Sequence, residues 1–487
     1  MRGRFWASTA AFTALFATSF GACDPGFTID PAGYCLDEPQ DPRCPPPSAG
    51  TGGSGGTGGS LQGNAGTAPS GSSGSGGVGG SGSAGAPPTC TAPQIDCSGT
   101  CVDVTQDNAQ NCGACGYACE AGRACTGGTC SPLPIVDGVV APYALAVDAS
   151  FVYFTVPALN ASGGALPVQR VPRDGGAAAA VPFLGGPAFR ARSLVLIEGT
   201  LYFGDLGSGK ILQGSVSGGS VTEHPSGSQP AVQQLLASGD TLLWNLFDGG
   251  NSRMRRTPPG NGGAGGASGA GGAGGANGAG GTGAGGFEEL AFQSGRIGAV
   301  GGTDDAVVFW INRDTSPVAN SGLWRKTNEA TPENLLPGDG MVALAVGSDE
   351  AFVADAVGGI GKVQAAAAAK APAPRTNVIG PSDVGGVLQG LAVTPSNLYW
   401  LAVTAGGQLE LHRAARDGTD ARVLGRVQTK QPAYWAAPVG PLGPSQLLID
   451  SGFVYFADPG TLEGDVLDDN LSGVKGEPDG AIYRLPQ

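Results

Sequence analysis

Hydrophobic positions alternate with polar ones along most of the chain, in short runs that come in pairs with a polar turn between them. The clearest pair is LLIDSGFVYFAD, from Leu447 to Asp458. Alternation with a period of two and many β-branched and aromatic residues predicts strands, and two such runs around a short turn predict a hairpin. Six weaker copies precede this one. The middle residue of the second run anchors each of the seven copies, and these residues are, in chain order, Tyr153, Tyr202, Leu243, Phe309, Phe352, Tyr399 and Tyr455.

The spacing of the copies predicts the architecture. They recur at intervals of 49, 41, 66, 43, 47 and 56 residues, and the 66 becomes 39 without a 27-residue Gly/Ala insertion at 260–286. A period of 40 to 50 residues made only of strands is typical of propeller blades. We therefore predict an all-β fold, a seven-bladed β-propeller over residues 133–487, in which 260–286 is a disordered loop.

The two ends of the repeat region predict how the ring closes. The seventh repeat contains only three strands, whereas residues 134–140 form a strand-like run ahead of the first repeat. We expect this run to supply the missing outer strand and so remove an exposed edge. Four predicted third strands carry arginine, and we expect these side chains to be solvated, with their stems on apolar neighbours. They include Arg170, Arg255, Arg256, Arg325 and Arg484.

The N-terminal region predicts export. Arg2 and Arg4 precede an apolar run from Phe5 to Phe20, which is too short for a comfortable membrane span but typical of a secretory signal, so residues 1–22 are predicted to be removed. Residues 23–44 then form an anchor segment. Residues 45–89 contain 17 glycines and no charged side chain, which predicts a disordered Gly/Ser/Pro linker.

The cysteines fit an exported protein, because exported thiols usually pair. The chain has 11 cysteines, so one is left over, and Cys23 is our candidate for lipid attachment. An ordinary cleavage site beside a structural cysteine is the alternative. Residues 90–130 are predicted to be a cysteine-rich disulfide module with few large apolar residues. Five disulfides are expected among Cys35, Cys44, Cys90, Cys97, Cys101, Cys112, Cys115, Cys119, Cys125 and Cys130. A zinc half-site or a redox dithiol at Cys112-x-x-Cys115 remains an alternative.

Three segments resemble known families. Phe20-Gly21-Ala22-Cys23 resembles the lipobox of bacterial lipoproteins, although Phe20 replaces the usual leucine. The segment Asp107-x-x-x-Asn111-Cys112-Gly113-x-Cys115-Gly116-x-x-Cys119 resembles the cysteine-rich module of plant stigma-specific proteins, which implies a small extracellular disulfide module.

The second strands resemble the Tyr-Trp-Thr-Asp repeats of low-density-lipoprotein-receptor-type propellers, as in Tyr202-Phe203-Gly204-Asp205. In that family the aspartate is structural and bonds backbone between blades, and the resemblance implies this role for Asp205, Asp355 and Asp458. The receptor propellers have six blades and several repeats here lack the acid.

The net charge and the positions of titratable residues limit the classes of function that we expect. Without its signal the chain has 24 basic and 40 acidic residues, so a nucleic-acid partner is not expected. The predicted inner strands lack titratable side chains, and His224 and His412, expected at the surface, belong to different repeats. A histidine-centred catalytic or metal site is therefore not predicted. No cofactor is expected, and the remaining metal hypothesis is calcium at an acidic loop with Asp465, Asp468 and Asp469.

The predicted ligand site lies two residues before the repeating leucine of each inner strand. In a propeller these positions surround one mouth of the channel, and in five repeats the residue there is polar. The set is Tyr143, Arg192, Gln233, Gln389 and Ser445, with Arg296 before the fourth repeat and Tyr434 and Trp435 in a Pro-rich loop before the seventh. We expect a lipid-anchored cell-envelope protein, exposed at the cell surface, that binds an extracellular protein or glycan. The alternatives are an extracellular hydrolase or lyase with a carboxylate or calcium site, and a structural envelope protein.

Overall fold

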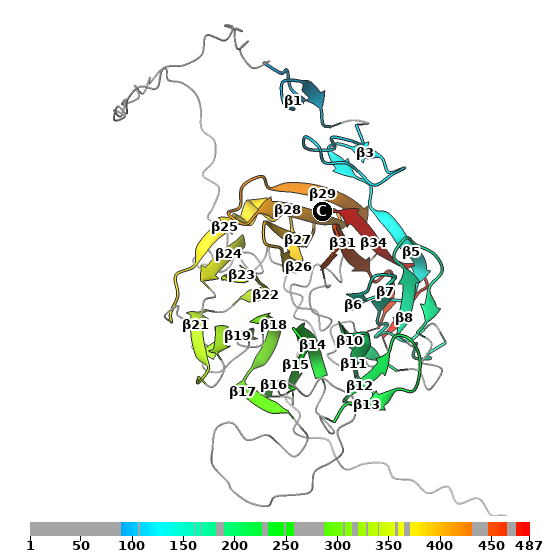
Figure 1. Cartoon of the computed structure of the whole chain (residues 1–487), viewed down its shortest axis with the longest axis vertical. Helices are drawn as coiled ribbons and strands as arrows, with labels where there is room; N and C mark the ends of the chain where they lie inside the picture. Colours follow the sequence, from blue (N-terminus) through cyan, green and yellow to red (C-terminus); the bar gives the residue numbers. More distant parts are fainter. Residues whose placement is uncertain are drawn as a thin grey trace, which may run out of the picture. The chain divides into compact units, whose positions relative to one another are not determined.

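A computed structural model describes residues 89–105, 108–160, 162–166, 168–181, 189–225, 232–247, 250–257, 287–304, 307–313, 320–327, 330–338, 340–355, 359–364, 371–430, 447–464 and 474–487. Strands dominate these residues, and their sheets surround a common centre, each with its first strand innermost (Figure 1). The all-β, seven-bladed propeller is confirmed. Within the described part of the chain, no helix has the length and hydrophobicity needed to span a membrane.

Blades one to six each contain a four-stranded antiparallel meander, and the seventh has four antiparallel strands, of which the outermost comes from the start of the propeller region. The first three blades are β6 (Leu145–Val147), β7 (Phe151–Phe154), β8 (Gln169–Pro172) and β9 (Ala179–Ala180); β10 (Ala191–Ile197), β11 (Thr200–Asp205), β12 (Lys210–Ser215) and β13 (Thr222–Glu223); and β14 (Val232–Ser238), β15 (Thr241–Phe247), β16 (Asn251–Arg256) and β17 (Glu288–Ser294). The next two are β18 (Arg296–Asp304), β19 (Val307–Arg313), β20 (Gly322–Thr327) and β21 (Glu333–Pro337); and β22 (Met341–Val346), β23 (Glu350–Asp355), β24 (Gly359–Gln364) and β25 (Thr376–Ile379).

The 3-10 turn η3 (Pro381–Asp383) follows the fifth blade. The sixth comprises β26 (Val387–Val393), β27 (Asn397–Val403), β28 (Gln408–Ala415) and β29 (Arg422–Gln428). The seventh comprises β30 (Leu448–Asp450), β31 (Phe453–Asp458), β34 (Gly480–Pro486) and β5 (Leu133–Val139), with a side hairpin of β32 (Leu462–Glu463) and β33 (Lys475–Gly476).

The repeated aromatic position forms the core between blades. Tyr153, Phe309, Phe352, Tyr399 and Tyr455 are at most 1% exposed. These residues lie in the second strands, which have a neighbouring strand on both sides and a packed blade on each face. Burial there explains why this register recurs while the outer strands vary, because each large side chain contributes roughly 1.5 to 3 kcal/mol by leaving water.

The ring closes as the sequence predicts. β5 pairs antiparallel with β34, so the start of the propeller region forms the outermost strand of the seventh blade. Ile135 and Val136 of β5 are buried in the core cluster that also contains side chains of β31 and β7. The backbone N–H of Gly176 in the first blade donates to the carbonyl of Ile135 at 3.0 Å. β5 therefore joins the seventh blade to the first.

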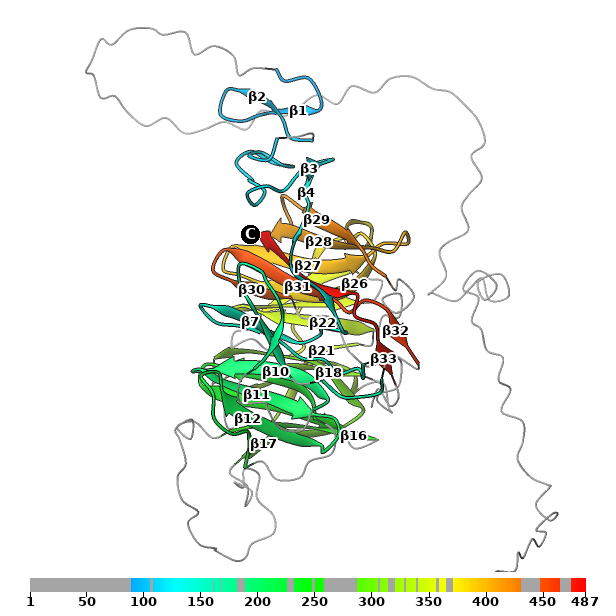
Figure 2. The same cartoon turned by 90° about the vertical axis from the view of Figure 1, so that its right-hand side faces the viewer.

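The cysteine-rich module extends the sixth blade. It consists of β1 (Gln94–Asp96), β2 (Cys101–Asp103), β3 (Cys125–Thr126) and β4 (Thr129–Cys130), and β4 lies beside β29, with Cys130 paired to Gly425 (Figure 2). A Cβ atom at Gly425 would lie 2.5 Å from Leu485 and 2.9 Å from the carbonyl of Cys130, so only glycine permits this approach. Its disulfides are Cys90–Cys101, Cys97–Cys115, Cys112–Cys125 and Cys119–Cys130.

Side-chain contacts hold this module against the sixth and seventh blades. The hydroxyl of Tyr117 donates to the carbonyl of Pro486 at 3.2 Å, and the guanidinium of Arg422 lies 5.0 Å from the centre of the Tyr117 ring. Arg484 of β34 forms an ion pair with Glu120. Because Cys112 and Cys119 belong to the same buried cluster as these blades, the module and the propeller share one core.

The arginines of the third strands are more buried than predicted. Arg256, Arg325 and Arg484 are only 8%, 1% and 6% exposed, so the expectation that they are solvated is wrong for these three. Arg256 and Arg325 pair with Glu288 and Glu333 on the adjacent outer strands, both at 2.7 Å. A carboxylate on the neighbouring strand compensates the cost of burying each guanidinium, and the sequence pattern of a single strand does not reveal it.

The repeated aspartates are structural in different ways. Asp205 accepts from the N–H of Arg190, in the link from the first blade, at 3.0 Å. Asp458 accepts from the Thr429 hydroxyl of the sixth blade at 3.2 Å, and burial raises its pKa. Both fit the implied bonding between blades. Asp355 departs from it, because it pairs with Arg375 of its own blade at 2.6 Å.

Candidate functional site

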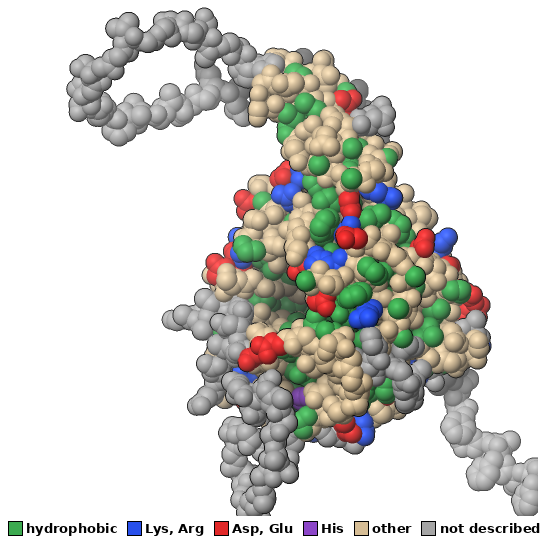
Figure 3. Space-filling model, turned by 45° about the vertical axis from the view of Figure 1, so that its right-hand side comes forward, with side chains coloured by type: hydrophobic (Ala, Val, Ile, Leu, Met, Phe, Trp, Pro, Cys, Tyr) green, Lys and Arg blue, Asp and Glu red, His purple; other side chains and the backbone are tan. Residues whose placement is uncertain are grey.

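The inner strands of all seven blades line a central channel with a volume of about 380 Å³. Its wall is almost entirely apolar, and Gln234 is the one polar side chain among the lining residues that are described. The others are Leu145, Ala146, Val147, Leu194, Val195, Leu196, Leu235, Leu236, Ala237, Ala299, Val300, Ala343, Leu344, Gly390, Leu391, Leu447 and Leu448. Figure 3 shows a hollow in the face that it draws, with hydrophobic and acidic side chains at its edge.

The inner strands share an irregularity at the predicted mouth position. In blades two, three, five and six, the pairing of first and second strands skips one residue, and that residue stands two positions before the repeating leucine. These residues are Arg192, Gln233, Val342 and Gln389. In the first blade, Tyr143 and Ala144 both bond to Thr155. A β-bulge of this kind changes the direction of a side chain, and it recurs at the same register position in these inner strands.

Polar side chains at this register position interact between neighbouring blades. Arg192 donates to the Oε1 atom of Gln233 at 2.6 Å, across the contact between β10 and β14. Burial raises the pKa of Tyr143 to about 12, against the lowering effect of the positive charge of Arg192. Arg192 and Gln233 are joined by a hydrogen bond, and the charge of Arg192 acts on Tyr143; we call these three residues the mouth cluster. Arg192 is only 6% exposed, so the surrounding structure fixes its position.

The fourth blade contributes to the mouth through a different strand. Its inner strand skips Gly298, where the other blades have a side chain. A Cβ atom at Gly298 would lie 2.3 Å from Nε of Arg313, so the guanidinium of this β19 residue occupies that space. The predicted Arg296 instead lies 5.0 Å from the ring centre of Phe247. Sequence spacing missed Arg313 because it belongs to the second strand of its blade.

Several predicted residues lie outside the described part of the chain. They are Cys23, Cys35, Cys44, Tyr434, Trp435, Ser445, Asp465, Asp468 and Asp469, together with the insertion 260–286. Their roles remain predictions. Of the predicted mouth residues that are described, Arg192 and Gln233 share a hydrogen bond, and Gln389 occupies the equivalent position in the sixth blade and is 6% exposed. The described lining of the cavity includes none of these three residues or Tyr143, so their role in ligand binding stays a prediction.

Both histidines are buried, so the prediction that they lie at the surface is wrong. His224 is 6% exposed and lies edge-on between Tyr202 and Trp244, and burial lowers its pKa to about 4. His412 is 5% exposed, stacks on Trp400 and has its Nε2 atom 3.2 Å from Glu410. Their hydrophobic settings belong to separate blades, which fits structural roles better than a shared catalytic one.

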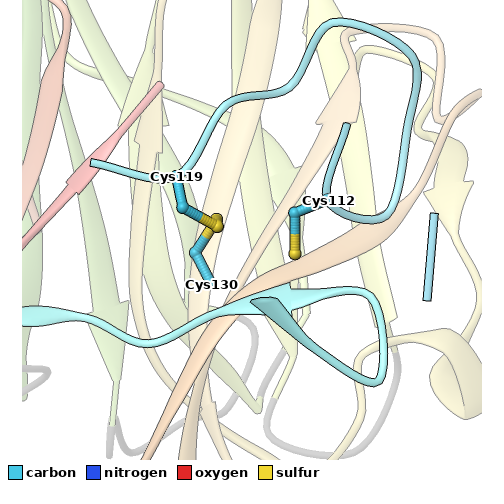
Figure 4. Close-up of side chains that lie close together, drawn as sticks. All are labelled: Cys112, Cys119 and Cys130. Carbon is cyan, nitrogen blue, oxygen red and sulfur yellow. A yellow bond between two sulfur atoms is a disulfide. The ribbon is translucent and has the colours of Figure 1, made fainter. Parts of the chain in front are cut away.

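Three cysteine sulfurs form the one cluster with metal-ligand spacing in the described residues. Sγ atoms of Cys112, Cys119 and Cys130 lie within 4.8 Å of one another (Figure 4). All three belong to disulfides, and a metal requires thiolates. Cys112 and Cys115 also belong to different disulfides, so the dithiol and zinc alternatives do not fit this arrangement. The cluster is the compact core of the module.

Comparisons with known proteins gave separate matches for the cysteine-rich module and for the propeller. Residues 83–132 match the Stigma-specific STIG1-like protein family. The disulfide-rich module indicates an extracellular or secreted protein. No curated protein matches the chain in sequence.

Solved structures resemble the propeller part. A selenomethionine-substituted virginiamycin B lyase from Staphylococcus aureus is 12% identical, with a TM-score of 0.45, and the match covers 73% of this chain and 99% of that one. The computationally designed Ika8 protein is 12% identical, with a TM-score of 0.40 and coverage of 73% and 98%. A chain of a nidogen/laminin complex is 14% identical, with a TM-score of 0.33 and coverage of 54% and 91%.

Proposed function

We propose that this chain is an exported, lipid-anchored cell-envelope protein whose propeller binds an extracellular protein or glycan at the mouth of the central channel. The mouth cluster is the observation that supports this most directly. Arg192 and Gln233 are within two residues of the lining residues Leu194 and Gln234 along the chain, and ligand sites usually combine an apolar cavity with a few fixed polar groups.

The chemistry of the site favours binding over catalysis. A hydrolase or a lyase requires an acid, a base or a metal at the reacting atoms. The described channel lining contains no carboxylate, histidine or cysteine, and Tyr143 holds its proton because its pKa is raised to about 12. Arg192 and Gln233 can orient a ligand through hydrogen bonds but do not supply a general base.

A screen of glycan and surface-protein arrays with the mature chain tests the binding proposal. The parent and the variants Arg192→Ala, Gln389→Ala and Arg426→Ala are compared for each ligand found. Arg426 lies on the outer strand β29 and serves as the matched control. We expect the first two variants to lose binding while the control keeps it, with melting curves showing that each variant is folded.

Binding that persists in both mouth variants, or that the isolated region 84–132 reproduces in full, would exclude the mouth as the ligand site. The anchor is tested separately by mass spectrometry of the mature N-terminus from membranes. A diacylglycerol-modified Cys23 is expected, and a free Cys23 or a different first residue would contradict it.

A further inference from the structure

Another cavity lies between the third and fourth blades and is distinct from the central channel. Its volume is about 350 Å³, and it shares no described lining residue with the channel. It is bounded by the outer strand β17 of the third blade and by residues of β19 and β20 in the fourth. No inner strand contributes to its described lining, so a ligand bound here would not occupy the mouth of the channel.

Hydrogen bonds between the two blades fix the polar groups of this cavity. Nε1 of Trp310 in β19 donates to Oε1 of Gln293 in β17 at 2.8 Å. Nδ2 of Asn312 donates to the carbonyl of Ser294 at 3.1 Å and to the carbonyl of Asn320 at 3.2 Å. The side chains at the wall are therefore held in place before a ligand binds, which lowers the cost of ordering them.

These bonds leave an acceptor and a donor that a ligand can use. Asn312 is only 1% exposed, yet its Oδ1 atom accepts no hydrogen bond from the described residues. Gln293 accepts from Trp310 through Oε1, and its Nε2 group is a donor at the cavity wall. A buried acceptor without a partner is rare in folded proteins, because it has lost its hydrogen bonds to water. Hydroxyl groups of a ligand can donate to the acceptor and accept from the donor.

Trp324 supplies an apolar surface in the same cavity. It is half-buried and stacked with Trp310, with ring centres 6.4 Å apart and planes 13° from parallel. Its Nε1 donates to the carbonyl of Asn320 at 2.9 Å, which fixes the indole in the wall. The indole therefore offers carbon surface, and the C–H groups on one face of a sugar ring pack well on the negative face of an aromatic ring.

Size and charge narrow the class of ligand. A water molecule in the liquid occupies roughly 30 Å³, so the cavity has space for about a dozen non-hydrogen atoms, as many as one hexose contains. None of the described lining residues is charged. The chain has a formal net charge of −14, so its average surface repels anions. An uncharged ligand is therefore favoured.

We propose that this cavity binds a neutral hexopyranose unit of an extracellular glycan. The ring packs on Trp324, one hydroxyl group donates to Oδ1 of Asn312, and another accepts from Nε2 of Gln293. An aliphatic or aromatic side chain of a peptide would fill the same space but leave both amide groups without a partner. The inference does not depend on the mouth of the channel, where the function proposed above locates its ligand.

Titration calorimetry of the oxidised chain with the methyl pyranosides of glucose, galactose and mannose tests the assignment. Sorbitol has hydroxyl groups without a ring, and glucuronate adds a negative charge to the ring, so these two are the control ligands. We expect at least one methyl pyranoside to bind at least tenfold more tightly than either control. The inference is wrong if none of the three binds, or if a control ligand binds as tightly.

Variants locate the sugar at the residues that line the cavity. Trp324→Leu and Gln293→Ala should each reduce the affinity at least tenfold, because one removes the ring surface and the other a hydrogen-bond donor. Gln213→Ala is the matched control and should leave the affinity unchanged, since Gln213 is a half-buried glutamine on the third strand of the second blade. Melting curves identify any variant that does not fold.

Hydrogen exchange of the parent chain tests the location without a substitution. With the bound pyranoside, protection should rise in β17 and β20 relative to the same concentration of sorbitol. Protection that rises only in the inner strands would overturn this inference and support the site proposed at the mouth. Unchanged affinity in folded Trp324→Leu and Gln293→Ala chains would also overturn it.

Discussion

Replacing Ile135 with alanine should weaken the whole propeller, because this residue belongs to the strand that closes the ring. Ile135 is 1% exposed and packs in the cluster shared by the module, the seventh blade and the first blade. Its carbonyl also accepts the N–H of Gly176. Truncating a buried isoleucine to alanine removes the transfer free energy of three carbon atoms and leaves a cavity, which together cost about 2 to 5 kcal/mol.

The expected change in melting temperature follows from the size of the unfolding unit. Unfolding entropy is roughly 2.1 cal/mol/K per residue, which gives about 0.75 kcal/mol/K for the 355 residues from Leu133 to Gln487. A loss of 2 to 5 kcal/mol then lowers the melting temperature by about 3 to 7 °C. Differential scanning calorimetry of the oxidised chain measures this shift. Hydrogen exchange should show lost protection in both the first and the seventh blade.

Ile95→Ala is the matched control, since it is the same substitution at a residue that is 39% exposed in the module. Surface substitutions usually change stability by no more than about 0.5 kcal/mol, so its melting temperature should stay within about 1 °C of the parent. If Ile135→Ala also melts within 1 °C of the parent, the pairing of β5 with β34 does not hold the ring closed.

Three further predictions concern the module, a histidine and the insertion. Replacing Cys119 and Cys130 by serine should destabilise the propeller by about 2 to 5 kcal/mol, whereas removing the peripheral Cys90–Cys101 bridge should leave its calorimetric transition nearly in place. Burial lowers the pKa of His224 to about 4, so between pH 6.5 and 4 the unfolded chain binds a proton that the folded chain does not. The free energy of unfolding should therefore fall by about 3 kcal/mol between pH 6.5 and 4. The variant His224→Phe should remove this dependence, and its melting temperature should change less with pH over that interval. Excising 260–286 should change the melting temperature by less than about 2 °C, because loop closure depends only weakly on length, and a loss of folding would contradict the loop assignment.

The sequence was sufficient for the number of blades and for ring closure because both depend on periodic burial. In six of the seven blades the anchor residue of the second strand is buried, so a large apolar residue recurs there with the blade, and Tyr202 in the second blade is the half-buried exception. The missing outer strand is found by counting strands. Disulfide connectivity could not be predicted, because eight cysteines permit 105 pairings and local spacing does not select among them. The sheet contact between β4 and β29 could not be predicted either, since a single glycine, Gly425, permits it.

The burial of charged residues could not be read from one strand at a time. Arg325 follows an alternating pattern that also suits a solvated residue, and its burial depends on Glu333 on the next strand. His412 likewise depends on Trp400 of the preceding strand and on Glu410, whose pKa is lowered by its hydrogen bond to the imidazole. These are properties of pairs across a sheet, so they emerge only when the strand register is known.

The residues predicted at the mouth of the channel also depend on strand register, and they bear on function. Counting back from the repeating leucine locates Tyr143, Arg192 and Gln233, because their blades keep the bulge at one register position. In the fourth blade that position is glycine, and an arginine from the adjacent strand fills the space. The mouth is therefore defined by a place in the blade that different strands can supply. Two positions in the sequence can therefore place a guanidinium at the same point of a blade, and counting along a single strand finds Arg192 but not Arg313, which belongs to the adjacent strand.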